Sequence, residues 1–240
     1  MQQVDNKTFN QALVGSIRAV PIILGYIPIG IAFGVLASTA DLTILQAVAM
    51  SIFVFAGSSQ FIAVALISSG ASLMAIATTV FLVNLRHLLM SAYLAPHLKK
   101  MKNWQQALFS YQLTDESFAL HSVYLRQKGI PPEAELFGLN MTAQLAWIAG
   151  TALGVWAGGM MAIDTEKYGI DFVLPAMFIA LLLMQLNDRK QVLVALVAAI
   201  FSLLFYLTAE NQLYIIIATV IAATFGTLAF RGRDQEEGGH

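Results

Sequence analysis

Residues 53–66 read FVFAGSSQFIAVAL. They lie inside a long apolar run from Leu42 to Ile67, and a small polar cluster, AGSSQ at 56–60, interrupts this run near its middle. Glycine weakens the helical hydrogen-bond ladder, and serine side chains can satisfy the backbone groups that are freed. This stretch therefore predicts a broken helix in an apolar environment.

Composition places the chain in a membrane. Of its 240 residues, 58% are apolar and only 11% are charged, whereas about a quarter of a soluble domain is charged. We expect an all-α integral membrane protein, a polytopic helical bundle in contact with lipid, with residues 1–240 forming a single transmembrane domain. The net charge of −1 argues against nucleic-acid binding, and the absence of cysteine excludes disulfides and thiolate metal sites. No cofactor or metal is expected.

The chain holds about seven candidate spans. A crossing helix needs about 20 apolar residues, and the candidates are Ile17–Ala37, Leu42–Ile67, Ser72–Leu94, Leu136–Ile163, Phe172–Leu186, Val192–Leu207 and Leu213–Phe230. An eighth candidate, residues 104–125, contains acids, so it is either an amphipathic surface helix or a span whose acids face a protein interior. Loop charges favour seven spans. Of the twelve Lys and Arg residues other than the intramembrane Arg86, this version puts nine on the cytoplasmic side, and the eight-span version puts eight there. Both versions place the C-terminus in the cytoplasm.

Two pairs of segments indicate an internal repeat. AFGVLA at 32–37 matches ALGVWA at 152–157 at four of six positions, and QFIAVAL at 60–66 matches MFIALLL at 177–183 at four of seven. Similar offsets in the same order predict a 3+3 repeat with units at about 17–94 and 136–207, a polar connecting helix at 104–125 and a final span at 213–230. Seven spans make the units inverted, as is common in secondary transporters, and eight make them parallel.

The two repeats contain helix breaks at matching positions. Ser58 corresponds to Pro175, which interrupts the fifth span. Matched breaks point to a transporter's substrate site, because half-helix N-termini suit a carboxylate and exposed carbonyls suit an ammonium. We predict a site lined by Gly57, Ser58, Ser59, Gln60 and Pro175. Alternatively, these small residues only allow close packing, and Pro175 is a first-turn proline.

Four charged or titratable residues lie in apolar surroundings. Arg86 is predicted to bind a substrate carboxylate, or else extends to the lipid headgroups. His87 either couples proton movement to transport or bonds to a neighbouring helix. Asp115 and Glu116 are candidates for binding a substrate ammonium, balancing the charge of Arg86 or exchanging protons. The alternative is the solvated face of an amphipathic helix.

Small and amide residues predict helix contacts. The GxxxG patterns Gly30–Gly34 and Gly154–Gly158 predict close helix packing, with an oligomer interface as the alternative. Asn140 and Gln144 lie one turn apart and either line a cavity or bridge helices. An enzyme is disfavoured, because no HExxH or nucleophile-elbow pattern is present.

Five short motifs follow one another along the chain: YIPIGIAFG (26–34), FAGSSQF (55–61), NLRHLLM (84–90), LTDESFA (113–119) and LPAMF (174–178). In their order and spacing they resemble the AzlC/YgaZ family, the large subunits of bacterial branched-chain amino-acid exporters. The resemblance implies an inner-membrane secondary transporter that exports leucine, isoleucine, valine and methionine with a small AzlD-type membrane subunit. Asn84 stands where some relatives have an acid, which weakens a proton relay through that position. A channel for another small solute and a non-transporting scaffold are the alternatives.

Overall fold

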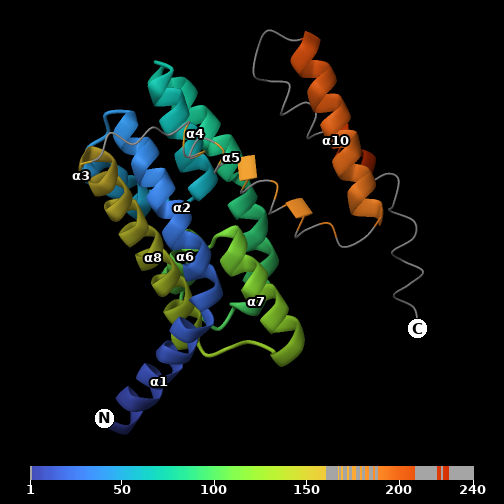
Figure 1. Ribbon diagram of the computed structural model, residues 1–240. Helices are drawn as coiled ribbons and strands as arrows, with labels where there is room; N and C mark the ends of the chain where they lie inside the picture. The colour runs from blue at the N-terminus through green and yellow to red at the C-terminus, as the bar shows by residue number, and fades with distance from the viewer. Residues whose placement is uncertain are drawn as a thin grey trace. The chain divides into compact units, whose positions relative to one another are not determined.

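The computed structural model describes residues 2–160 and 189–208, together with residues 167, 169, 172, 175, 176, 179, 182, 183, 186, 221, 222 and 224–226. All regular elements among these residues are helical, as predicted. The chain divides into two compact units, residues 1–174 and 175–240. The helices of the first unit are α1 (Gln2–Arg18), α2 (Val20–Thr39), α3 (Ile44–Phe53), α4 (Gly57–Ser68), α5 (Leu73–Leu94), η1 (Ala95–His97), α6 (Asn103–Tyr111), α7 (Asp115–Lys128) and α8 (Glu133–Met160) (Figure 1).

Two of the described helices are long and apolar enough to cross a membrane. They are α2 and the segment Leu73–His97, in which α5 continues into η1. The second unit contains α10 (Arg189–Thr208), which includes the predicted span Val192–Leu207. The predicted spans Phe172–Leu186 and Leu213–Phe230 fall largely outside the described residues, as does the C-terminal tail.

Helices α2 and α8 form the centre of the first unit and run in the same direction (Figure 1). Gly30 lies against Gly150, and Gly34 lies against Gly154, so residue numbers rise together along both helices. A Cβ atom added to Gly34 would lie 2.8 Å from the Cα atom of Gly154. The predicted close contact of these glycines is confirmed. The two AFGVLA-like segments are therefore parallel, which contradicts the inverted arrangement that the seven-span version required.

Helix α3 runs back along α2 for only part of its length. At its beginning, the backbone N–H of Leu42 donates to the carbonyl of Ala37 near the end of α2 (3.0 Å). After its last residue, the ring of Phe55 meets the ring of Tyr26 in the first half of α2, with 6.4 Å between centroids. The chain then turns at residues 54–56, where Phe55 has a φ of +40°.

Helix α4 returns toward the side from which α3 came. The ring of Phe61 packs on Phe33, further along α2 (5.5 Å between centroids), and Gln60 Nε2 donates to Ser51 Oγ of α3 (3.1 Å). The predicted break in the span Leu42–Ile67 is therefore confirmed, but the two halves fold back on each other instead of continuing in one direction. Helices of 10 and 12 residues extend about 15 and 18 Å, roughly half of a bilayer core of about 30 Å. We call residues 44–68 hairpin 1.

Helices α6 and α7 form a second hairpin that comes from the opposite side. Gln105 Nε2 donates to Glu133 Oε2 at the beginning of α8 (2.7 Å). Further along, Gln112 Nε2 donates to Gln144 Oε1 (2.8 Å), so α6 runs parallel to α8. Its last residue is Tyr111.

Helix α7 then runs back to the side where α8 begins. His121 Nε2 lies 2.8 Å from Asn140 Oδ1, and Arg18 Nη2 donates to Tyr124 Oη (2.9 Å). The predicted single helix over 104–125 is wrong, because Thr114 forms a capping box with Ser117 and starts a new helix. We call residues 103–128 hairpin 2.

Helix α5 completes the first unit and connects the two hairpins. Its end and the following turn pack, through Leu94 and Leu98, in a cluster with Leu136 at the beginning of α8. The helix thus runs antiparallel to α8 and passes both hairpins. Since the hairpins start from opposite sides, their turns meet half-way along the unit.

Candidate functional site

Helix α4 begins at the turn of hairpin 1, and its first residues are largely buried. Ala56 precedes the helix in an extended conformation and provides no side-chain cap. The backbone N–H of Gln60 is the first to bond within the helix, to the carbonyl of Ala56 (3.0 Å). The amides of the first turn point out of the helix and, together with the helix dipole, favour an anion.

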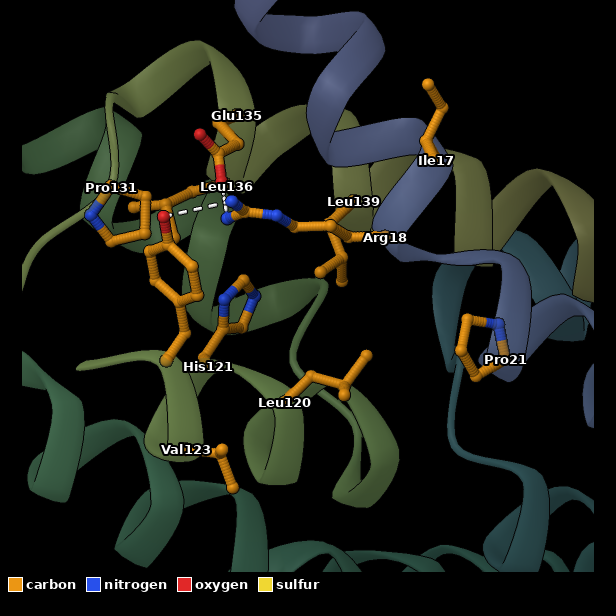
Figure 2. Close-up of a pocket in the computed structure, with 11 residues that line it drawn as sticks. Ile17, Arg18, Pro21, Leu120, His121, Val123, Pro131, Glu135, Leu136 and Leu139 are labelled. Carbon is orange, nitrogen blue, oxygen red and sulfur yellow. Dashed lines mark hydrogen bonds and ion pairs between the residues drawn. The ribbon is translucent and has the colours of Figure 1, made fainter. Parts of the chain in front are cut away.

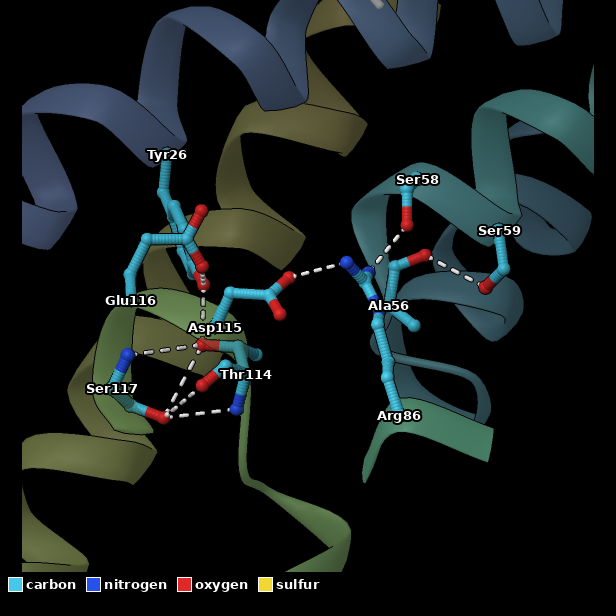
Figure 3. A network of polar contacts seen from close by, with 9 residues as sticks. All are labelled: Tyr26, Ala56, Ser58, Ser59, Arg86, Thr114, Asp115, Glu116 and Ser117. Atoms are coloured by element: carbon cyan, nitrogen blue, oxygen red, sulfur yellow. Dashed lines mark hydrogen bonds and ion pairs between the residues drawn. The ribbon is translucent and has the colours of Figure 1, made fainter. Parts of the chain in front are cut away.

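Arg86 of α5 joins the turns of the two hairpins (Figure 3). Its Nη2 donates to Ser58 Oγ (2.5 Å), and its Nη1 lies 2.7 Å from Asp115 Oδ2. The side chains of Arg86 and Asp115 are 29% and 21% exposed, so the ion pair is largely shielded. Asp115 is the first residue of α7, where the helix dipole stabilises its negative charge.

Tyr26 of α2 holds the turn of hairpin 2 (Figure 3). Its buried hydroxyl makes hydrogen bonds with Thr114 Oγ1 (2.6 Å) and Glu116 Oε2 (2.7 Å). Two carboxylates, those of Asp115 and Glu116, therefore project from the first turn of α7. His87 is half-buried beside Arg86, within electrostatic range of both Arg86 and Glu116.

Not every hairpin 1 residue that was predicted for the substrate site contacts the charged cluster, by which we mean Arg86, Asp115, Glu116 and their partners Tyr26, Ser58 and Thr114. Ser59 Oγ donates to the carbonyl of Ala56 (2.9 Å), and Gln60 Oε1 accepts a bond from Trp147 Nε1 (3.0 Å). Gly57 lies against the Trp147 ring, where a Cβ atom would be 3.0 Å from the nearest ring carbon. These three residues hold α4 in place, and only Ser58 contacts Arg86.

Pro175 belongs to the second unit, where it is helical and exposed. Its predicted place in the site stays a prediction.

Sequence reasoning missed Tyr26 and Thr114. Tyr26 lies in an apolar motif and had no charged neighbour to distinguish it. Thr114 could have been found, because Thr-x-x-Ser at 114–117 has the spacing of a helix start.

Amide side chains fasten hairpin 2 to α8 behind the charged cluster. Gln144 accepts from Gln112 and donates from Nε2 to the carbonyl of Ile52 (3.3 Å). Asn140 bonds to His121. Both residues bridge helices, which was one of the two predicted alternatives.

Groups of opposite charge face each other where the turns of the two hairpins meet. A guanidinium and the amides at the start of α4 lie on one side, and the carboxylates of Asp115 and Glu116 lie on the other. This is the pattern that would receive the carboxylate and ammonium of a zwitterion. Within the described residues, no group of three His, Cys, Asp or Glu side chains could hold a metal ion.

Comparison with known proteins identifies the family. Residues 21–161 match the family described as AzlC protein. The chain is 31% identical to an uncharacterized membrane protein of Helicobacter pylori (85% of this chain, 90% of the relative) and 31% identical to the inner membrane protein YgaZ of Escherichia coli (76% and 77%). It is 27% identical to the branched-chain amino acid transport protein AzlC of Bacillus subtilis (72% and 66%). No solved structure matches. The chain therefore belongs to the AzlC family, as its motifs predicted.

Proposed function

We propose that this protein is a secondary transporter that exports leucine, isoleucine, valine and methionine across a bacterial inner membrane. Two relatives support this proposal, since one is named a branched-chain amino acid transport protein and another an inner membrane protein. The observation that carries it is the position of Arg86, which joins the turns of two opposed hairpins through Ser58 and Asp115.

In this proposal the ion pair is the substrate-free state of the binding site. The substrate carboxylate replaces Asp115 on the guanidinium and also accepts hydrogen bonds from the backbone amides of Gly57 and Ser58. The substrate ammonium is then held by Asp115 and Glu116. Each charge keeps a partner throughout, so the exchange avoids leaving an unpaired charge in a shielded place.

The hairpins would serve as two gates. Hairpin 1 separates the site from one side of the membrane and hairpin 2 from the other, so movement of one hairpin at a time gives alternating access. A proton gradient or the membrane potential drives export, with His87, Asp115 and Glu116 as the groups that exchange protons. A small AzlD-type membrane subunit is the partner, and the C-terminus lies in the cytoplasm.

The test is efflux of labelled leucine from vesicles that contain the purified protein and its small subunit. We expect saturable efflux that valine inhibits and that Arg86→Ala or Asp115→Asn abolishes. Lys100→Ala removes a charge from the turn after η1 and serves as the control. Unchanged rates in both site variants, at matched protein levels, would refute the proposed site. Flux that does not saturate would indicate a channel, and no flux would indicate a scaffold.

A further inference from the structure

A second place in the first unit combines paired charges with an apolar wall. A cavity of about 390 Å³ lies on the side where α2 and α8 begin, between the junction of α1 and α2, helix α7 and the first turn of α8 (Figure 2). Its size falls in the range of about 300–1,000 Å³ that is typical of small-molecule pockets. None of its lining residues belongs to the cluster around Arg86.

The cavity contains a fixed cation and a fixed anion. Arg18 forms an ion pair with Glu135 and donates from Nη2 to Tyr124 Oη (2.9 Å). The guanidinium carbon also lies 3.9 Å from the centroid of the Tyr124 ring, so the ring holds the guanidinium in place. Glu135 is only 8% exposed, whereas the side chain of Arg18 is 33% exposed and accessible to a ligand.

Most of the remaining lining is aliphatic. Leu120 and Val123 of α7 and Leu139 of α8 contribute to it, and Leu139 is buried. Such a wall suits a branched aliphatic side chain, because burying apolar surface is favourable and requires no directed partner.

We propose that this cavity is a second binding site for a zwitterionic amino acid with an aliphatic side chain. The ligand carboxylate binds Arg18, its ammonium binds Glu135, and its side chain lies against Leu120 and Leu139. A simple anion would take Arg18 and leave the buried Glu135 without a counter-charge, which is costly. A zwitterion leaves both charges paired, and this selects the ligand class.

The place of the cavity suggests its use, which rests on the proposed function. Helix α7 forms one wall through His121 and Tyr124, and its other end carries Asp115. Six to nine residues separate these positions, which corresponds to about 9–14 Å along the helix axis. The cavity thus lies against hairpin 2, away from its turn, where substrate waits before or after it occupies the site at Arg86.

The test counts the leucine molecules that one chain binds, by equilibrium dialysis of labelled L-leucine against the purified protein. We expect two in the wild type and one in Val123→Trp, which fills the cavity from a position that is 53% exposed. Leu145→Trp adds the same bulk at a position of α8 that is 57% exposed and outside the cavity, and should keep two. Arg18→Gln is the second variant and should also bind one. Glutamate and lysine, which carry a net charge, should not compete at the cavity.

The outcomes separate this inference from the proposed function. A single leucine that is lost in Arg86→Ala and retained in Val123→Trp and Arg18→Gln overturns the cavity site and leaves the proposed function intact. A single leucine that is lost in Val123→Trp and retained in Arg86→Ala supports the cavity and refutes the site at the hairpins. Release of a copurified lipid by Val123→Trp, with leucine binding unchanged, assigns the cavity to lipid and overturns the inference.

Discussion

Replacing Arg86 tests whether the guanidinium binds substrate with both of its terminal nitrogens. In the structure, Nη1 contacts Asp115 (2.7 Å) and Nη2 contacts Ser58 (2.5 Å). A hydrogen bond to a charged group contributes about 1.5–3 kcal/mol. Because the side chains of Arg86 and Asp115 are 29% and 21% exposed, solvent screening favours the lower value, about 1.5 kcal/mol for each bond.

Two such bonds to a substrate carboxylate amount to about 3 kcal/mol, and the bond to Asp115 that the carboxylate replaces offsets about 1.5 kcal/mol. The net contribution of about 1.5 kcal/mol corresponds to roughly a tenfold change in the dissociation constant, so we expect Arg86→Gln to weaken leucine binding about tenfold. Arg86→Lys keeps the charge but loses the two-pronged guanidinium geometry, so it should weaken binding only about threefold. Isothermal titration of leucine into the purified variants gives both values.

The effect must be separated from loss of the fold. Thermal unfolding followed by the fluorescence of the three tryptophans reports stability, and a cycle with Asp115→Asn isolates the ion pair. We expect a coupling energy of about 1 kcal/mol between the two positions, within the range of about 0.5–3 kcal/mol for residues in contact. If the Gln variant is folded and binds leucine as tightly as the wild type, Arg86 has only a structural role and the binding scheme is incorrect.

Two further predictions concern the fold. Gly34→Ala should destabilise the protein by about 1–3 kcal/mol, because its new Cβ atom overlaps the backbone of α8. Gly25→Ala in the same helix meets nothing within 4 Å, so it should be neutral or stabilise the protein by up to about 1 kcal/mol. Equal melting temperatures for the two variants would contradict the packing of α2 on α8. Single cysteines placed at Ala40 and Ser69, on either side of hairpin 1, should react with a membrane-impermeant maleimide from the same side of the membrane, and one at Lys100 from the opposite side. Labelling of the first two from opposite sides would show that residues 44–68 cross the membrane.

The sequence could predict the local features because each depends on nearby residues alone. The apolar runs indicated helices, the cluster at 56–60 indicated a break, and glycines spaced by four residues indicated close packing. The motifs pointed to the family, and four of the five lie within the residues that match it. Arg86 and Asp115 were recognised as unusual because a charge in an apolar run is costly wherever the run lies.

The sequence could not predict the reversal of the chain at each break. An apolar run of suitable length is expected both for one crossing helix and for two half-length helices that fold back, since both bury the same side chains. The choice depends on contacts between distant residues, such as Phe55 with Tyr26 and Gln60 with Ser51. Hairpin 2 was harder still, because its polar residues are satisfied by partners on α2 and α8.

Only the tertiary structure brings the candidate site together. Ser58, Arg86 and Asp115 come from α4, α5 and α7, and they meet because the two hairpins approach from opposite sides and end at the same depth. The parallel direction of α2 and α8 follows from the same arrangement, since neither hairpin carries the chain across the unit. The sequence determines which side chains carry charge, but the proximity of opposite charges depends on packing between residues that are distant in the sequence.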